Sequence, residues 1–147
     1  MRRIQLLVLS AALLVAADTP KPQGTADPLQ GKWYIVHLDR PGEKKGREAF
    51  DFRDTEFTLT FDRGTVTSMH QGKVLWQGAY RLDPGVNPNA IEITRRSGPF
   101  KQGIYQQTGD TLKLCLDYPA SPRPTRFSAG KDSRAEVMVF RRMKPGS

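Results

Sequence analysis

Between residue 55 and residue 142 the sequence consists of short segments in which apolar and polar residues alternate, and this pattern limits the possible folds more than any other feature. In residues 55–62, Phe57, Leu59 and Phe61 alternate with polar residues, which is the period of a strand with one buried face. Turns rich in glycine and proline separate the segments. We expect eight strands, at residues 29–40, 55–62, 65–71, 73–82, 90–95, 101–107, 111–118 and 135–142.

Consecutive strands joined by short turns, without crossover helices, form an antiparallel meander. A meander of this length has two exposed edges unless its first and last strands pair. The sequence therefore predicts an all-β fold, a small eight-stranded antiparallel up-and-down barrel.

The N-terminus has the layout of a secretory signal peptide over residues 1–17. Arg2 and Arg3 precede an apolar run at residues 4–15, and small residues follow it. The alternative is an uncleaved anchor, but the run is shorter than the roughly 20 residues that span a membrane. We expect a secreted or periplasmic (cell-envelope) protein without a transmembrane span in its mature form. Residues 18–28 would be a flexible tail, residues 29–142 the barrel domain and residues 143–147 a C-terminal tail.

Charge is distributed unevenly along the predicted mature chain. Residues 18–94 hold 10 basic and 11 acidic side chains, whereas residues 95–147 hold 11 basic and 4 acidic ones. A basic half can attract an anionic polymer or a cell-envelope surface. The alternative is a solvated surface that keeps the protein soluble, and the scattered basic residues favour it. We do not expect nucleic acid as a partner.

The sequence holds one cysteine, Cys115, which cannot form an internal disulfide. Strict alternation places it on the face of Lys113 and Asp117, opposite the neighbouring leucines. The thiol could be accessible there, or it could be a small buried hydrophobe under a loop. We favour the buried position.

A search for catalytic and metal-binding motifs finds no nucleophile elbow, zinc-binding helix, Cys-x-x-Cys pair or phosphate-binding glycine loop. The sequence therefore predicts a non-enzymatic protein without catalytic residues, metal or cofactor. His37 is expected on the face of Trp33, as a polar point in a cavity or as a satisfied barrel histidine. An acidic cluster lacks the ligand spacing of a calcium loop and is expected to be solvated; it comprises Glu48, Asp51, Asp54 and Glu56.

Gly31-Lys32-Trp33, with Arg141-Arg142 at the end of the last strand, resembles the arrangement that closes lipocalin barrels. There a tryptophan of the first strand is covered by an arginine of the last, in a cation–π contact. The resemblance implies that Gly31, Trp33 and Arg142 close the barrel. Whether Arg141 or Arg142 covers the indole stays open.

Further motifs are similar to those of a family of small uncharacterised lipocalin-like domains known mainly from planctomycete bacteria. The resemblance covers residues 29–142. It rests on residues 29–33, 82–84, 87–88, 90–91, 103–105, 109–115 and 123–127. It implies an exported lipocalin-like barrel and no particular activity.

The inward faces of the predicted strands carry bulky apolar residues that suit either a ligand cavity or a filled core. Gly78 would open space among them, and the long connection at residues 41–54 corresponds to the loop over the mouth of lipocalins. The first hypothesis is a module that binds a small apolar or amphipathic molecule. The alternative is a solid barrel whose basic outer surface contacts an anionic polymer or a partner protein. The candidate ligand-binding residues are Phe57, Leu59, Phe61, Trp76, Tyr80, Ile91 and Ile93.

Overall fold

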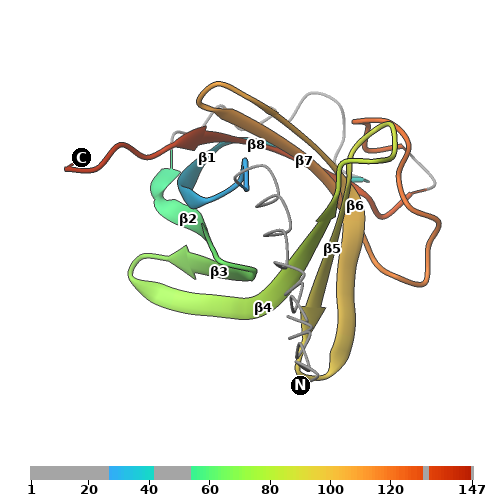
Figure 1. The fold of residues 1–147 in the computed structure, drawn as a ribbon, viewed down its shortest axis with the longest axis horizontal. Coiled ribbons are helices and arrows are strands. Elements are labelled where there is room, and N and C mark those ends of the chain that lie inside the picture. The colour runs from blue at the N-terminus through green and yellow to red at the C-terminus, as the bar shows by residue number, and fades with distance from the viewer. Residues whose placement is uncertain (1–26, 42–53, 131–132, 147) are drawn as a thin grey trace, which may run out of the picture.

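The computed structural model describes residues 27–41, 54–130 and 133–146. The fold is all-β, a closed eight-stranded antiparallel barrel with the strands in sequence order (Figure 1). The strands are β1 (Gly31–Asp39), β2 (Asp54–Asp62), β3 (Thr65–His70), β4 (Lys73–Asp83), β5 (Ala90–Arg95), β6 (Gly98–Thr108), β7 (Thr111–Asp117) and β8 (Glu136–Arg142). The predicted leader, most of the predicted N-terminal tail and residues 42–53 lie outside the described residues.

The predicted strands agree with the observed ones to within one or two residues, except at the start of β6. The sequence predicts a break at residues 97–99, but Gly98 and Pro99 already pair with β5. Gly98 adopts a φ of +116°, which lets the chain reverse after Arg96. The register shifts next to Pro99, where a residue without an N–H group is tolerated in a sheet.

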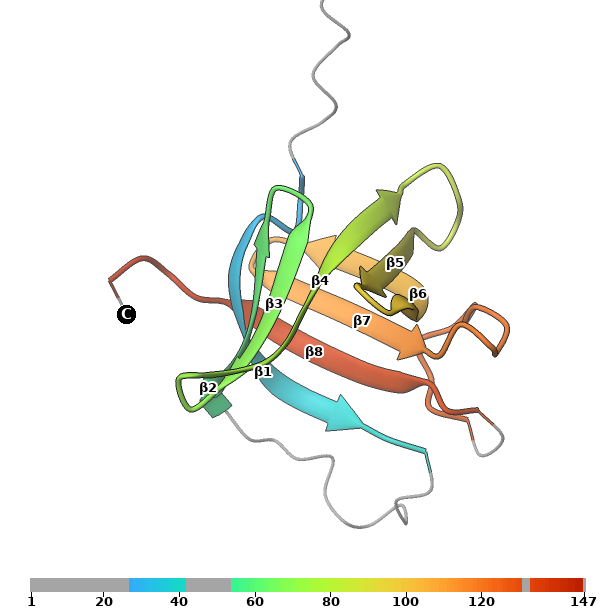
Figure 2. The same cartoon turned by 90° about the horizontal axis from the view of Figure 1, so that it is seen from below.

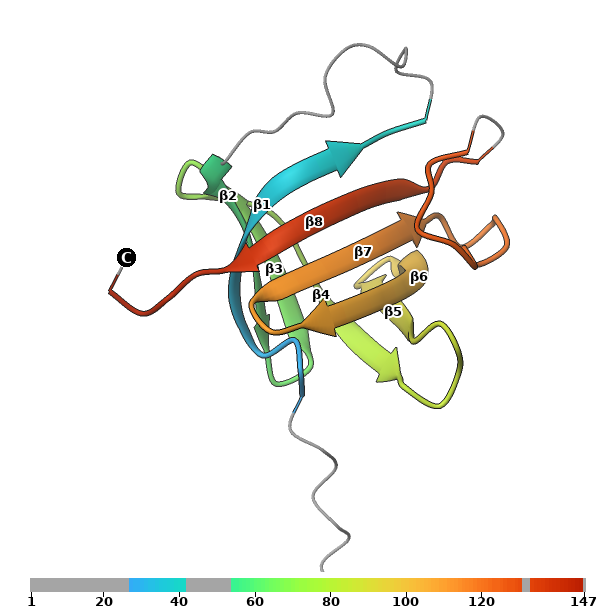
Figure 3. The same cartoon turned by 90° about the horizontal axis from the view of Figure 1, so that it is seen from above.

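The barrel is fully paired at one end and separates into two half-sheets at the other (Figures 2 and 3). The first half of β1 pairs with β2, whereas its residues 37–39 pair, among the residues that the structure describes, with β8 alone. Similarly, residues 73–78 of β4 pair only with β3, and residues 79–83 pair with β5. At this open end, β2, β3 and the start of β4 therefore form one half-sheet, and β5 to β8 with the end of β1 form the other.

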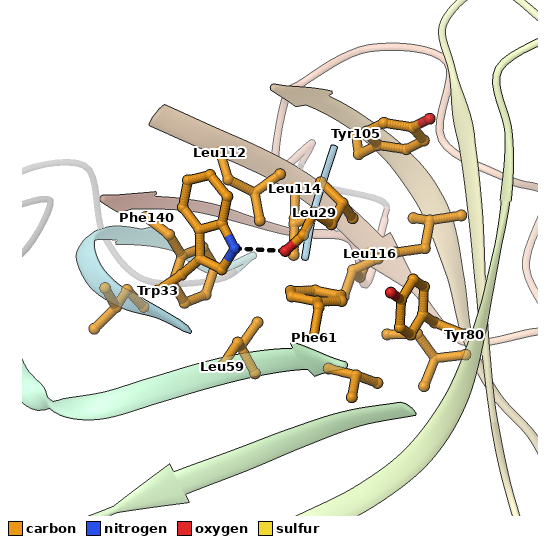
Figure 4. Packing of buried hydrophobic residues seen from close by; sticks show 14 residues of the cluster. Leu29, Trp33, Leu59, Phe61, Tyr80, Tyr105, Leu112, Leu114, Leu116 and Phe140 are labelled. Atoms are coloured by element: carbon orange, nitrogen blue, oxygen red, sulfur yellow. Dashed lines mark hydrogen bonds between the residues drawn. The ribbon is translucent and has the colours of Figure 1, made fainter. Parts of the chain in front are cut away.

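The closed end, where β1 begins and β8 ends, has a solid core around Trp33. The indole is fully buried, and its Nε1–H donates to the carbonyl of Leu29 at 2.8 Å (Figure 4). The guanidinium of Arg142 lies 4.1 Å from the indole centroid and donates to the carbonyl of Gln30 at 2.8 Å. Arg142, rather than Arg141, therefore covers Trp33. Gly31 has a φ of +122° and makes room for this guanidinium, since a Cβ there would lie 3.0 Å from its Nη1.

Cys115 lies on the outer face of the barrel and is nevertheless fully buried. It packs with Ile104, Ala135 and Val137, and Phe127 from the β7–β8 connection lies against this small cluster. Burial raises the pKa of the thiol. The position that the sequence favours, a small hydrophobe under a loop, is confirmed.

Bulges change which residues face inward, and the predicted face of His37 is wrong for this reason. The register of β1 against β8 shifts between Ile35 and His37, so that Leu38 and not His37 contacts the core. A second shift, in the β3–β4 pairing, leaves Val74 59% exposed, although strict alternation along β4 would place it on the face of Trp76.

Gly78 opens no space in the barrel interior, which corrects a further prediction. A Cβ at this position would lie 2.4 Å from the backbone carbonyl oxygen of Thr94. The glycine therefore permits close approach of β4 and β5 at the point where the two strands begin to pair.

Candidate ligand-binding cavity

A cavity of about 630 Å³ lies at the open end, between the two half-sheets. Its volume falls within the range of small-molecule pockets, roughly 300–1,000 Å³. Apolar side chains form most of its wall, and charged ones occur at the ends of β1, β6 and β8. The lining residues are Ile35, Leu38, Arg40, Phe57, Leu59, His70, Leu75, Trp76, Phe100, Lys101, Leu116, Glu136 and Met138.

The structure separates the predicted ligand-binding residues into two groups. Phe57, Leu59 and Trp76 line the cavity. The other four are buried in the core beyond it, where they fill the barrel; they are Phe61, Tyr80, Ile91 and Ile93. The barrel is thus solid at one end and hollow at the other, because its strands converge at the closed end and diverge at the open one.

Charged side chains of the opposite half-sheet form a network on the cavity wall. Glu136 accepts from Arg40 Nε at 3.1 Å and lies 3.7 Å from the Nζ of Lys101. The Lys101 side chain is only 10% exposed, and its ammonium also lies 3.8 Å from the centroid of the Tyr118 ring. One inward-facing carboxylate thus neutralises part of the charge of two cations.

A third cation, Arg95, lies where β4 separates from β5. It follows Ile91 and Ile93 on the inward face of β5 by the period of a strand. Its guanidinium carbon is 3.8 Å from the centroid of the Phe100 ring and 5.5 Å from that of Trp76. Both rings line the cavity, so this arginine joins the two half-sheets through aromatic stacking. Within the described ranges it forms no ion pair.

Ser68 places a hydroxyl group beside the apolar wall. It is fully buried on the inward face of β3, between Val66 and His70, and it pairs with Leu59 and Trp76 on the neighbouring strands. Its Oγ has no hydrogen-bond partner among the residues that the structure describes. A buried hydroxyl without a partner is rare in a core. It is a polar group available next to the cavity.

A second hollow of about 570 Å³ lies at the closed end, near Asp27 and the β4–β5 loop. The Tyr80 hydroxyl donates to Asp27 Oδ2 there, while Asp27 Oδ1 accepts from the backbone of Leu29. Burial and the adjacent carboxylate raise the pKa of Tyr80, and burial also raises that of Tyr105. The Tyr80–Asp27 bond fastens the segment before β1 onto the barrel, so we assign this hollow a structural role.

Metal binding finds no support in the described part of the chain, where no group of three or more potential ligands occurs. Of the predicted acidic cluster, Glu48 and Asp51 lie outside the described residues, as does the side chain of Asp54. Glu56 is exposed. The expectation of a solvated cluster therefore stays a prediction.

Sequence reasoning missed the residues that give this cavity its charge, namely Arg40, Lys101 and Glu136. One signal was present: Glu136, Met138 and Phe140 share a face of the last predicted strand by period 2. For Arg40 the alternation is misleading. Counted by twos from Trp33, it places Arg40 on the outer face, but the bulge in β1 turns the residues after Ile35 to the opposite face.

Comparison of the chain with protein-family models, with curated proteins and with solved structures found no match. The described residues include no helix with the length and apolarity that crossing a membrane requires. Function must therefore be argued from the cavity itself.

Proposed function

We propose that this chain is an exported, non-enzymatic, lipocalin-like binding protein that holds a small apolar or amphipathic molecule between its two half-sheets. The observation that carries the proposal is the cavity of about 630 Å³ with a largely apolar wall. Side chains of both half-sheets line it, so a bound molecule would bury apolar surface on two sides. The signal-peptide pattern of residues 1–17 supports export, and the motifs over residues 29–142 support kinship with the planctomycete lipocalin-like domains.

The proposal is tested by titration with N-phenyl-1-naphthylamine, a neutral apolar dye that fluoresces when it leaves water. We expect saturable binding to the wild-type protein. Met138→Trp should weaken it at least about tenfold, because the larger side chain fills the cavity. Arg141→Trp is the matched control, since Arg141 is exposed on the same strand. No saturable binding by the folded protein, or equal binding by the Met138→Trp variant, would contradict the proposal.

A complementary experiment is native mass spectrometry of the protein purified from its own host. We expect a small molecule that co-purifies with the wild-type chain and is lost from the Met138→Trp variant. The mass of that molecule would identify the ligand.

The alternative is contact with an anionic polymer or a partner protein through the basic second half of the chain. Five exposed cations without an ion pair in the described residues favour it: Arg96, Arg126, Arg134, Arg141 and Lys144. We expect salt-sensitive retention on a polyanion column if this function exists. Equal retention by a variant with all five replaced by glutamine would count against it.

A further inference from the structure

The two half-sheets separate at a fork, which consists of residues 73–78 of β4 on one side and residues 94–96 on the other. β4 pairs with β5 from Ala79 onward, whereas residues 73–78 pair, within the described ranges, with β3 alone. Figure 2 shows the start of β4 turning away from β5 and β6. A strand edge of this kind presents backbone N–H and C=O groups to which another strand can bind.

The hydrogen bonds between β3 and β4 determine which backbone groups point into the fork. The N–H group of Tyr80 donates to the carbonyl of Gly64 at 2.9 Å, so the backbone of Tyr80 faces β3. Successive residues of an antiparallel strand bond to opposite sides, and Ala79 and Gln77 therefore face away from β3. Ala79 pairs with β5, whereas the N–H and carbonyl groups of Gln77 point into the fork.

Val74 turns its backbone to the same edge, nearer the hairpin. The turn at residues 71–72 has a positive φ at both positions, so the pair of residues that flanks it, which includes Lys73, is hydrogen-bonded. Val74 comes next and therefore faces away from β3. The side chains of Val74 and Leu75 are exposed, so this edge also offers apolar surface to a partner.

A polar hollow of about 590 Å³ lies in the fork beside Gln77. Two arginines line it, Arg95 at the end of β5 and Arg96 in the turn that follows. Neither forms an ion pair within the described ranges, and none of the described residues that line the hollow is acidic. The Phe100 and Trp76 rings lie on one side of the Arg95 guanidinium, which leaves its other side to the hollow. The hollow therefore favours an anionic group.

The same two rings close the inner side of the fork. Trp76 and Phe100 meet across the gap between their strands, with ring centroids 5.3 Å apart. Both rings line the cavity and therefore point toward the barrel interior. A strand added to β4 would lie over these rings, outside the cavity.

We propose that the fork binds an extended acidic peptide of a partner protein, which adds a strand to the free edge of β4. The peptide runs antiparallel to β4, as β5 does, with its amino end beside Arg95 and Arg96 and its carboxyl end toward Lys73. Backbone groups of Val74 and Gln77 form its hydrogen bonds, and the two arginines select acidic side chains near its amino end. This interaction goes beyond the cavity function and does not depend on it.

The test is fluorescence anisotropy with the peptide Asp-Glu-Val-Thr-Val-Thr, acetylated at its amino end and labelled at its carboxyl end. Valine and threonine favour the extended conformation. We expect saturable binding to the wild-type protein. A peptide with lysine in place of both acidic residues should bind at least about tenfold more weakly, because it loses charge-assisted hydrogen bonds to the arginines. The acidic peptide with N-methylated backbone amides should lose a similar factor, since it keeps the charge but cannot pair with a strand.

Gln77→Pro tests the free edge itself. Proline removes an N–H group that points into the fork and none that bonds to β3, so the barrel should fold, as circular dichroism can verify. Binding of the acidic peptide should weaken about fivefold or more. Gln77→Ala is the matched control, because it keeps the N–H group and should bind the peptide as the wild type does.

A second variant tests the charges. Arg95→Gln combined with Arg96→Gln should remove the preference for the acidic peptide over the lysine peptide. The matched control combines Arg126→Gln with Arg134→Gln, which changes the net charge equally at exposed positions outside the fork. This control should keep the preference.

Several results would overturn the proposal. One is a wild-type protein that does not bind the acidic peptide, and another is a folded Gln77→Pro variant that binds it equally well. Equal binding of the N-methylated peptide would indicate charge attraction alone, as for an anionic polymer. A wild-type dimer that Gln77→Pro converts to monomers in sedimentation would assign the edge to a second copy. Peptide binding that occurs only after residues 42–53 are replaced by glycine and serine would assign it to that segment of the chain.

Discussion

Trp33 shows how one residue can hold a barrel end together. Its indole fills the closed end, its N–H group satisfies the Leu29 carbonyl, and its face supports Arg142. Arg142 in turn reaches the carbonyls before β1 and lies 3.5 Å from Asp110 in the β6–β7 turn. Packing, hydrogen bonding and a cation–π contact therefore act on the same few side chains.

We expect Trp33→Ala to lower the free energy of unfolding by about 3–5 kcal/mol, the usual range for loss of a buried large aromatic side chain. Urea denaturation followed by circular dichroism measures this change. Trp76→Ala is the control, because Trp76 is only partly buried at the open end and should cost less. A loss below about 1 kcal/mol for Trp33→Ala would mean that the core tolerates the empty space left by the indole.

Ionisation of the Tyr80 phenol makes the free energy of unfolding depend on pH in the alkaline range. Burial and the Asp27 carboxylate raise the pKa of its phenol, so the unfolded chain loses this proton first as the pH rises above about 10. The folded state then binds more protons than the unfolded state, and stability falls with rising pH. Tyr80→Phe should show a shallower fall between about pH 10 and pH 12 than the wild type.

The measurement for Tyr80 is the midpoint of urea denaturation at several pH values. Tyr118→Phe, which removes a phenol from an exposed side chain, is the matched control. An identical alkaline slope for wild type and Tyr80→Phe would show that the Tyr80–Asp27 contact does not persist in solution.

The β6–β7 pair leaves no room for a side chain at Gly103. A Cβ at this position would lie 1.9 Å from the carbonyl oxygen of Cys115 on the paired strand. Backbone atoms of a sheet cannot move aside as a flexible side chain can. The glycine is therefore required by strand pairing, although its φ is ordinary.

We expect Gly103→Ala to destabilise the barrel by about 1–3 kcal/mol or more, as overpacking does in a close-packed core. Thermal denaturation followed by circular dichroism is a suitable measurement. Gly130→Ala is the matched control, since its Cβ would meet only Ser133 Oγ at an ordinary 3.8 Å. Equal melting temperatures for the two variants would contradict this account of the β6–β7 pair.

The sequence predicts the positions of the strands better than the contacts between them. Alternation located all eight strands, because a barrel strand buries one face and exposes the other. It could not locate the bulges in β1 and β4, since a bulge is set by the pairing of two strands and leaves little trace in either. Those bulges decide that Leu38 faces inward and Val74 outward, so the cavity wall was only partly predictable.

At the scale of the whole molecule, the two ends of the barrel differ in their hydrogen bonding. Residues 73–78 of β4 pair on one side only, and within the described ranges the same holds for residues 37–39 of β1. The central strands of the closed end pair on both sides. Local opening should therefore require less free energy at the open end.

We expect amide hydrogen exchange to be faster for residues 73–78 than for residues 111–117 of β7, by about tenfold or more for a difference of 1.4 kcal/mol in opening free energy. Mass spectrometry of proteolytic peptides resolves the two segments. Saturation with a cavity ligand should slow exchange in residues 73–78 and leave β7 unchanged. Uniform protection of both segments would argue against a barrel that separates at one end.

The separation into two half-sheets also affects how the sequence of this chain can evolve. Trp33 and Phe61, which fill the closed end, do not line the cavity, although Ile35, Leu59 and Leu116 belong both to the core and to the cavity wall. Substitutions at Phe57 or Met138 would alter the shape of the binding space at little cost to the fold. The same framework could therefore acquire new ligands by drift at its open end, while its closed end stays under selection for folding alone.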